Sequence, residues 1–312
     1  MTPREKISLL LFLFCVCAVL GLEVFLLARS IMKRIRRDPA RNTLVTKPAL
    51  CLHGLATVVV ISLLYGFFVE PNWIETTIVT LPTTKLKESP FRIVQISDLH
   101  CDTTPRNEER AVQIINQLKP DVVVATGDFL NDASALPLLR HTLGRLEAPL
   151  GVFAVTGNFE GRFVPVVDLF QGTDVRLLQQ DTVTVTKGDD SVRISGLSLD
   201  RAAAYRDFLQ DLQLEHFNVF LFHKPDLIEA VQNLPVDLYL CGHTHGGQVA
   251  LPLYGALITF SKFGKKYESG RYRVGQTVLY VNRGLGLEPR PAPQVRFLAR
   301  PEITVFDIVP AP

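Results

Sequence analysis

The sequence has few cysteines and little net charge, and both absences exclude classes of protein. Of its five cysteines, Cys15, Cys17 and Cys51 lie in strongly apolar stretches, which leaves only Cys101 and Cys241 elsewhere. Two cysteines are too few for the disulfide framework of a small secreted domain. The 33 Lys and Arg residues nearly balance the 31 Asp and Glu residues, and the later part of the chain has no basic stripe interleaved with aromatic residues. We therefore expect no nucleic-acid partner.

The sequence does contain two long apolar runs near its start. Residues 7–28 include only two polar side chains and residues 48–69 only four. Each run is as long as the roughly 20 residues that a membrane-spanning helix needs. A cleaved signal peptide would account for the first run alone, but a second run follows it. We therefore predict that residues 1–69 form a membrane anchor of two transmembrane helices and that residues 70–312 form a separate domain.

The loop between the two apolar runs is strongly basic. It contains one acid, Asp38, and seven basic residues, which are Arg29, Lys33, Arg34, Arg36, Arg37, Arg41 and Lys47. Lys and Arg in short loops mark the cytoplasmic side of a membrane protein. We accordingly predict a multi-pass protein of the cell (inner) membrane, with residues 70–312 on the periplasmic or extracellular face. The cytoplasmic face stays open as an alternative.

Strand-like and helix-like segments alternate after residue 70. Apolar runs at 91–97, 121–127 and 151–157 have the length and composition of buried strands, and 107–119 has apolar residues at helical spacing. The later half is richer in strands. Such an alternation is typical of helices packed over sheets. We predict an α/β fold of four layers, in which a β-sandwich is flanked by helices.

Five of the predicted strands end in side chains that offer oxygen or imidazole donors. These are two aspartates, one asparagine and four histidines, namely Asp98, His100, Asp128, Asn158, His223, His243 and His245. In layered α/β folds, functional groups collect at the carboxyl ends of strands. If the five strands are neighbours, the seven side chains converge. For the remaining histidines, His53, His141 and His216, we expect ordinary exposed or hydrogen-bonded side chains.

Seven such donors are too many for a single tetrahedral metal ion. They suit two divalent ions about 3.5–4 Å apart that share a bridging carboxylate. Carboxylate and imidazole donors without a thiolate favour manganese, with iron or zinc as alternatives. A glycine directly precedes three of the donors (Gly127, Gly157 and Gly242), which fits sharp exits from the strands.

The order of these motifs resembles that of the calcineurin-like metallophosphoesterase superfamily. It runs D-x-H, GD, GN, a lone histidine and GH-x-H over residues 98–245, with 30 positions from Asp98 to Asp128 and 30 more to Asn158. The downstream segments GHTHGGQVALPLYGALI and LYVNRGLG further resemble the membrane-anchored YaeI/YkuE-type branch. The resemblance covers nearly everything after Glu70, and it implies a β-sandwich flanked by helices.

The resemblance also implies a role for each donor. One ion would be held by Asp98, His100 and His245, the other by Asn158, His223 and His243, with Asp128 as the bridge. A hydroxide between two divalent ions is a nucleophile at neutral pH, and the ions polarise phosphoryl oxygens. The implied activity is metal-dependent hydrolysis of phosphoric esters or pyrophosphates. Asn158 and Arg162 are candidate substrate contacts, and Arg283 is a further candidate for phosphate.

One position departs from the family pattern. The family reads GNH, whereas this sequence reads GNFE, so Phe159 stands where the family histidine helps the leaving group to depart. Phenylalanine cannot donate a proton, which fits a leaving group that departs readily as an anion. Some pyrophosphate-cleaving members also lack this histidine, including the UDP-diacylglucosamine hydrolases of lipid A biosynthesis. Phe159 therefore favours a diester or pyrophosphate, hypothetically linked to a lipid.

Three functional hypotheses follow from these features. The first is a membrane-anchored, dinuclear metal-dependent phosphohydrolase that acts on a phosphorylated small molecule or lipid. The second is narrower, a UDP-diacylglucosamine pyrophosphatase of lipid A biosynthesis, and it needs the catalytic domain in the cytoplasm because its substrate is there. The third is a non-catalytic membrane scaffold that binds metal. Hydrolysis of a phosphate ester or pyrophosphate separates the first two from the third.

Overall fold

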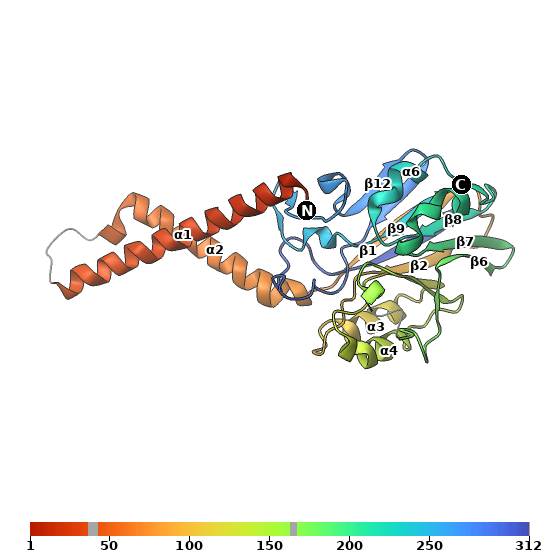
Figure 1. Ribbon diagram of the computed structural model, residues 1–312, viewed down its shortest axis with the longest axis horizontal. Coiled ribbons are helices and arrows are strands. Elements are labelled where there is room, and N and C mark those ends of the chain that lie inside the picture. Colours follow the sequence, from red (N-terminus) through yellow and green to blue (C-terminus); the bar gives the residue numbers. More distant parts are fainter. Residues whose placement is uncertain (37–42, 163–166, 312) are drawn as a thin grey trace.

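The computed structural model describes residues 1–36, 43–162 and 167–311. A long helical hairpin projects from one end of a β-sandwich (Figure 1). The hairpin contains α1 (Pro3–Ile35), which begins with a capping box between Thr2 and Glu5, and α2 (Lys47–Leu64). Both helices are long and apolar enough to cross a membrane, and most of their large apolar side chains are exposed. The described part of the chain therefore contains the two apolar helices that the sequence predicts.

Two six-stranded sheets form the sandwich. The first has the strand order β1-β14-β2-β3-β4-β5, with bounds Glu75–Thr83 (β1), Phe91–Ile96 (β2), Val122–Thr126 (β3), Val152–Val155 (β4), Val175–Leu177 (β5) and Glu302–Pro310 (β14). The second has the order β12-β13-β9-β8-β7-β6, with bounds Gln180–Lys187 (β6), Asp190–Leu197 (β7), Phe217–Leu221 (β8), Leu238–Cys241 (β9), Gly270–Val274 (β12) and Thr277–Val281 (β13). A small separate sheet pairs β10 (Ala250–Leu251) with β11 (Gly255–Ala256).

Helices cover both outer faces of the sandwich. The first sheet carries α3 (Glu108–Gln117) and α4 (Leu136–Leu143), and the second carries α5 (Tyr205–Gln210) and α6 (Ile228–Val231) (Figure 1). One apolar cluster fills the space between the sheets, and two more lie between each sheet and its helices. These four layers confirm the predicted α/β fold.

The hairpin ends where the sandwich begins. After α2 the chain continues through a π-helical turn (Tyr65–Val69) and a 3-10 turn (Glu70–Asn72) before it enters β1. The backbone N–H of Arg296 donates to the carbonyl of Gly66 at 2.9 Å, which ties the end of the hairpin to the sandwich. The N-terminus of α1 also lies beside this end of the sandwich (Figure 1).

Strand direction places the carboxyl ends of β2, β3 and β4 at the hairpin end of the sandwich. β1 starts beside the hairpin and runs away from it, and β14 is parallel to it with Glu302 opposite Glu75. β2 is antiparallel to β14, so Gln95 near its end lies opposite Thr304 near the start of β14. β3 and β4 run parallel to β2. Side chains that follow these strands therefore lie near the base of the hairpin.

The packing between the sheets yields a test of the core. Phe306 on β14 is fully buried, and its ring packs edge-on against Tyr280 with centroids 5.2 Å apart. We expect Phe306→Ala to cost about 3–5 kcal/mol of unfolding free energy, because it removes buried contacts and leaves a cavity. The thermal midpoint of the detergent-solubilised protein should fall by roughly 10 °C. Ile78→Ala is the matched control, since Ile78 is 63% exposed on β1 and should change the midpoint little. Equal shifts for both variants would contradict this packing.

Candidate metal centre

The strand ends bring six of the seven predicted donors into two buried groups. One group contains Asp98, His100 and His245, and the other contains Asp128, His223 and His243. Within each group, one donor atom of every residue lies within 4.8 Å of the others. The seventh donor, Asn158, is exposed, and its Oδ1 lies 3.1 Å from His223 Nε2. The convergence expected from the sequence therefore occurs, with donors from the ends of five strands.

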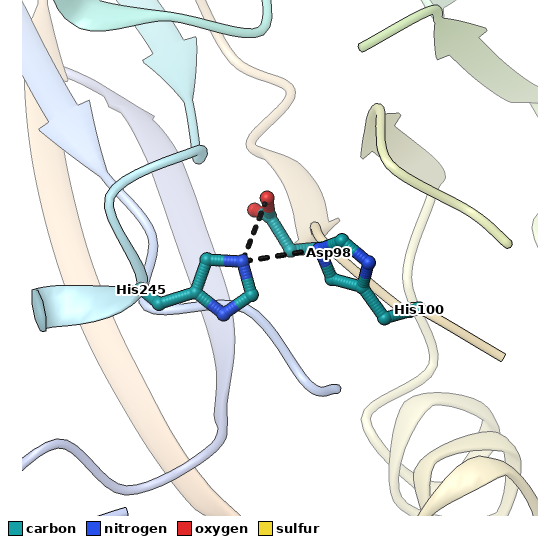
Figure 2. Close-up of side chains that lie close together, drawn as sticks. All are labelled: Asp98, His100 and His245. Atoms are coloured by element: carbon teal, nitrogen blue, oxygen red, sulfur yellow. Dashed lines mark hydrogen bonds and ion pairs between the residues drawn. The ribbon is translucent and has the colours of Figure 1, made fainter. Parts of the chain in front are cut away.

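The first group surrounds a common point (Figure 2). His245 Nε2 lies 3.3 Å from Asp98 Oδ1 and 3.2 Å from His100 Nε2. Two donors that each lie about 2.1 Å from one ion are on the order of 3–3.5 Å apart, so these atoms are spaced as ligands of a shared ion. On the other side of its ring, His100 Nδ1 lies 2.7 Å from Asn131 Oδ1, and this contact orients the imidazole.

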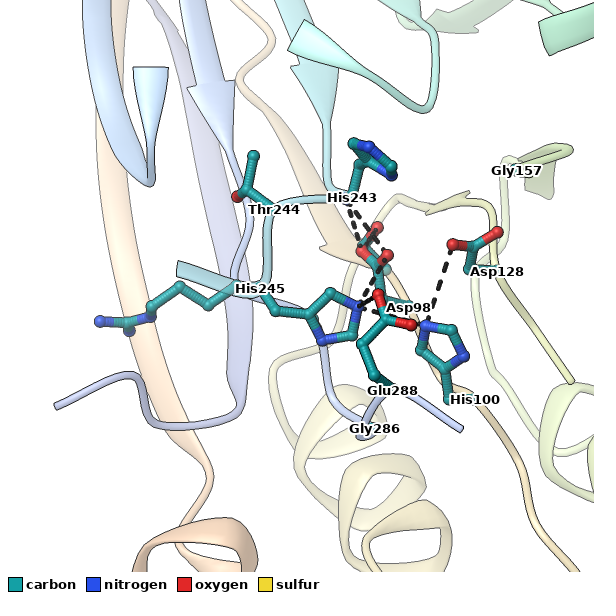
Figure 3. Close-up of polar contacts among 12 residues, drawn as sticks. Asp98, His100, Asp128, Gly157, His243, Thr244, His245, Gly286 and Glu288 are labelled. Carbon is teal, nitrogen blue, oxygen red and sulfur yellow. Dashed lines mark hydrogen bonds and ion pairs between the residues drawn. The ribbon is translucent and has the colours of Figure 1, made fainter. Parts of the chain in front are cut away.

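Asp128 lies between the two groups. Its Oδ2 is 3.1 Å from His223 Nε2 and 3.8 Å from His100 Nε2, and Figure 3 shows its carboxylate directed toward His100. Its Oδ1 accepts a hydrogen bond of 2.9 Å from the backbone N–H of Phe159. His223 Nδ1 lies 2.7 Å from the carbonyl of Thr126, which leaves Nε2 facing the site. One carboxylate in contact with a histidine of each group is placed to bridge two ions.

His243 Nδ1 is a buried polar atom with no hydrogen-bond partner among the described residues. Asp128 Oδ2, also buried, contacts imidazole nitrogens, those of His223 at 3.1 Å and His100 at 3.8 Å. A buried polar atom without a partner destabilises the fold unless a water, ion or ligand satisfies it. A divalent ion would satisfy both atoms at once, and the donor set of carboxylate oxygens and imidazole nitrogens is one that such ions accept. The residues present therefore fit two divalent ions.

Burial and mutual charge set the protonation of these side chains. Burial opposes ionisation of Asp98, but the nearby histidines His245, His223 and His100 together outweigh it and hold the pKa of Asp98 far below its usual value. Burial, reinforced by the charge of His223, lowers the pKa of His243 to about 3, so this imidazole is a neutral donor. His223 is also buried, yet the charge of Asp128 raises its pKa to about 9. An ion that binds here would displace the proton of His223.

The backbone at the strand ends is strained. Five of the seven donors have a positive φ between 44° and 71°, namely Asp98, His100, Asp128, His243 and His245. For residues with a side chain this conformation costs on the order of 1–3 kcal/mol each, and it persists only where the surroundings enforce it. The sharp reversal turns each side chain back into the pocket. Strain concentrated on these five residues is typical of a functional site.

The three glycines predicted at the strand exits are needed for two different reasons. Gly127 has φ +88°, which a residue with a side chain rarely adopts. The other two sit where backbones and side chains approach closely. A Cβ at Gly242 would lie 1.9 Å from Ser97 Oγ and 2.1 Å from Asp98 Oδ2, and one at Gly157 would lie 2.2 Å from an oxygen of Asp128. Any side chain at either position would displace an aspartate of the site.

Glu160 is a site residue that the sequence did not single out. Its buried carboxylate accepts hydrogen bonds from the backbone N–H groups of Asp128 (3.0 Å), Phe129 (2.7 Å) and Gly157 (2.5 Å). It therefore joins the loop after β3 to the loop after β4. Burial, together with the charge of Asp128, raises the pKa of Glu160 to about 7. Its position directly after Phe159 was the one signal in the sequence.

Arg296 supports the other side of the pocket and was also missed. Its fully buried guanidinium donates to the carbonyls of Ala299 (2.7 Å) and Gly286 (2.6 Å), and Nη2 lies 3.5 Å from His245 Nδ1. Burial lowers the pKa of Arg296 to about 9. Glu288 on the same loop approaches His245 Nε2 at 3.7 Å (Figure 3). Because Arg296 is also bonded through its backbone to the end of the hairpin, it links that end to His245.

Arg283 and Arg162 were the candidate arginines for contacts with the substrate. Arg283 Nη2 pairs with Glu75 at 2.8 Å and with Glu302 at 3.3 Å, so its guanidinium joins β1 and β14. The side chain of Arg162 lies outside the described residues. The three remaining histidines have ordinary partners, as expected, which are Glu23 for His53, Arg145 for His141 and Ser191 for His216.

Phe159 lies inside the site. It is buried, and its ring packs edge-on against the His100 ring with centroids 5.0 Å apart. A cavity of about 780 Å³ adjoins this region and is lined by His100 and its partner Asn131. Phe67 and Asn72, at the end of the hairpin, line the same cavity, as do Arg106 and Arg290. The cavity thus reaches from the first group of donors to the end of the second apolar helix.

Comparison with known proteins identifies the family. The model of the calcineurin-like phosphoesterases matches residues 91–247. The chain is 36% identical over 262 residues to the metallophosphoesterase YkuE of Bacillus subtilis (strain 168), covering 78% of this chain and 88% of that protein. The fold and site define a metal-dependent hydrolase of phosphoesters. The chain belongs to the calcineurin-like phosphoesterase family, in the branch that includes YkuE.

Two further relatives have names that state an activity or a location. The chain is 28% identical over 316 residues to the UDP-2,3-diacylglucosamine pyrophosphatase LpxG of Chlamydia trachomatis serovar D, covering 79% of this chain and 93% of that protein. It is 29% identical over 324 residues to a transmembrane protein with metallophosphoesterase domain of Bos taurus, covering 95% of this chain and 70% of that protein. The second match includes nearly all of this chain.

The position of Asp128 between the two groups yields a test by metal content. We expect Asp128→Asn to lower bound manganese from about two ions per chain to less than one, because it removes the shared charge while keeping the size of the side chain. Mass spectrometry of the purified, desalted protein measures this. Asp174→Asn is the matched control, since Asp174 is exposed and outside both groups. Unchanged metal content in Asp128→Asn would rule out the bridging role.

Proposed function

We propose that this protein is a membrane-anchored phosphohydrolase that uses two divalent ions, with manganese as the native metal, to cleave phosphodiesters or pyrophosphates on lipid-linked substrates. In this proposal residues 1–69 are the anchor and residues 70–312 the catalytic domain. The observation that carries the proposal is the pair of buried donor groups with Asp128 between them. Asp98, His100 and His245 hold one ion, and His223, His243 and the exposed Asn158 hold the other.

The ions, when bound, supply a metal-activated hydroxide and polarise the phosphoryl oxygens. The protein supplies position and charge. Asn131 and Thr126 fix the ring orientation of His100 and His223, and Asn158 is exposed at the site, where its amide can also meet the substrate. Phe159 places an apolar ring against His100, where it can donate no proton. A leaving group that departs as a stable anion is therefore favoured, such as the phosphate released from a pyrophosphate or the stabilised alcohol of an activated diester, whereas a simple alkoxide departs slowly without an acid.

The lipid-linked substrate is supported by the location of the site. The carboxyl ends of β2, β3 and β4 lie at the hairpin end of the sandwich, and the adjoining cavity is lined by Phe67 from that hairpin. Arg106 and Arg290 on the same cavity offer positive charge for a second phosphate. A small soluble ester would need no such placement beside two apolar helices.

A narrower candidate is the hydrolysis of UDP-diacylglucosamine in lipid A biosynthesis. The observation that favours it is the similarity to LpxG, a protein named for that activity. It requires the catalytic domain in the cytoplasm, whereas the basic loop between the helices favours the opposite face. A C-terminal fusion to alkaline phosphatase and another to green fluorescent protein decide between the faces. Phosphatase activity without fluorescence would exclude this substrate.

The apolar ring of Phe159 yields a test by substrate preference. We expect Phe159→His to raise the turnover of an alkyl phosphate monoester at least tenfold, because an imidazole at this position can protonate the alkoxide. Turnover of a nucleotide-sugar pyrophosphate should not rise, since its leaving group needs no acid. With manganese present, release of inorganic phosphate measures the monoester rate, and chromatography of the released nucleoside monophosphate measures the pyrophosphate rate. A chelator should abolish both.

Phe159→Leu is the matched control, because leucine is apolar and lacks a proton donor. It should leave alkyl phosphate turnover at the level of the unsubstituted protein. If Phe159→His raised neither rate, the leaving-group argument would be wrong. If the unsubstituted protein bound two ions yet hydrolysed no ester or pyrophosphate, it would be a metal-binding scaffold rather than an enzyme.

A further inference from the structure

Exposed apolar side chains on the sandwich gather at the base of the hairpin. Among the described residues after the hairpin, seven large apolar side chains are exposed, and five of them lie on segments next to its end. The five are Trp73, Leu253, Tyr254, Phe260 and Leu298, and we refer to them as the basal rim. The other two, Ile78 and Leu214, lie elsewhere, on β1 and in the loop before β8. Such an uneven distribution of exposed apolar surface marks a contact surface.

Direct contacts join the segments of the basal rim to both helices. Tyr254 Oη lies 2.6 Å from Ser8 Oγ on α1. Thr259, next to Phe260, donates from its N–H and its hydroxyl to Glu5 at 2.7 and 2.8 Å. This part of the basal rim therefore lies beside the first turns of α1.

The remaining members are joined to the end of α2. Phe297, next to Leu298, packs edge-on against Tyr65 with ring centroids 6.3 Å apart. Trp73 directly follows the 3-10 turn that ends the hairpin. The rim is thus continuous with the exposed apolar surface of both helices, which itself requires a hydrocarbon environment. A bilayer that covers the apolar surface of the two helices would therefore also reach the basal rim.

Cationic side chains accompany the aromatic rings of the rim. The guanidinium of Arg300 lies 4.1 Å from the centre of the Trp73 ring, and Lys265 Nζ lies 4.3 Å from the centre of the Tyr254 ring. Lys262 Nζ lies 4.8 Å above the neighbouring Phe263. Aromatic rings combined with Lys and Arg are the usual composition of protein surface at the headgroup level of a bilayer.

The backbone presents three of these side chains in a strained conformation. Leu253, Phe260 and Leu298 have φ values of 65°, 53° and 54°, which are uncommon for residues other than glycine, asparagine and aspartate. Leu253 is fully exposed at the tip of the turn between β10 and β11. Exposing a leucine in a strained conformation to water does not stabilise the protein. Moving its apolar surface from water into a lipid interface lowers the free energy.

The rim also borders the metal centre. The carbonyl of Phe260 lies 3.4 Å from His243 Nε2, so one residue contacts a donor of the second group and exposes its ring at the rim. The depth of the rim in a bilayer therefore fixes the depth of the pocket.

We propose that the basal rim enters the headgroup region of the bilayer and holds the metal centre at that depth. The pocket then receives a phosphate or pyrophosphate carried on a membrane lipid, while the hydrocarbon chains of that lipid stay in the bilayer. Insertion of the rim stands independently of catalysis, whereas the substrate class rests on the proposed function.

The test removes the apolar tips and leaves the metal centre alone. Leu253→Asn combined with Leu298→Asn deletes two exposed leucines, and asparagine tolerates a positive φ, so the turns should keep their shape. Leu214→Asn is the matched control, because Leu214 is 65% exposed in the loop before β8, away from the hairpin. Each full-length protein is reconstituted in vesicles of phosphatidylcholine and phosphatidylglycerol.

The first measurement reports insertion without any reaction. Trp73 is the one tryptophan of the chain, so quenching of its fluorescence by brominated phosphatidylcholine reports the depth of the rim. We expect quenching to fall at least twofold in the double variant and to stay unchanged in Leu214→Asn. Equal quenching in all three proteins overturns the proposal. So does a dimer in vesicles that the double variant abolishes, because the rim would then bind a second copy.

The second measurement compares two esters with the same leaving group. One is the p-nitrophenyl ester of phosphatidic acid in the vesicle, and the other is soluble bis(p-nitrophenyl) phosphate. The double variant should hydrolyse the vesicle-bound ester at least fivefold more slowly and the soluble ester at the same rate. Equal losses on both would overturn the substrate class. If the unsubstituted protein hydrolyses neither, the proposed function fails, and quenching still decides whether the rim inserts.

Discussion

The structure depends on the burial of two carboxylates beside one another. Asp98 and Asp128 are both fully excluded from solvent, and removing a charge from water costs several kcal/mol unless partners compensate. The compensation comes from imidazoles that follow strands of the other sheet, with His245 3.3 Å from Asp98 and His223 3.1 Å from Asp128. The two sheets therefore meet at this edge through charge, whereas apolar packing joins them elsewhere.

The same constraint explains the order around the site. Loops that carry buried charge must hold it in place, and here they do so with buried polar side chains that satisfy neighbouring backbone groups. Glu160 binds three N–H groups from two loops, and Arg296 binds the carbonyls of another. Positive φ values at five donors are sustained by this network. Because Arg296 also bonds to Gly66, the network extends from the metal centre to the hairpin.

The structure brings the side chains predicted as donors together, and it also shows supporting residues that the sequence did not reveal. Each donor could be found because it directly follows an apolar strand, which is a local pattern, and the strand ends of a layered fold meet by geometry. Glu160, Asn131 and Arg296 could not be found in this way, since their partners lie on other loops and no local spacing records such contacts. The ion pairs of Arg283 were not evident for the same reason, because its acidic partners Glu75 and Glu302 are distant in sequence.

Three features of this protein could be predicted from the sequence alone. They are two helices apolar enough to span a membrane, a layered α/β domain and seven candidate metal donors at strand ends. Only the tertiary structure decided where the donors lie relative to the hairpin. The physical reason is the pairing of strands. β1 leaves the hairpin, β14 runs beside it, and β2 returns antiparallel to β14, so Asp98 comes back to the level at which the chain left the second helix. Register across a sheet is set by contacts between distant segments, and a local sequence pattern does not contain it.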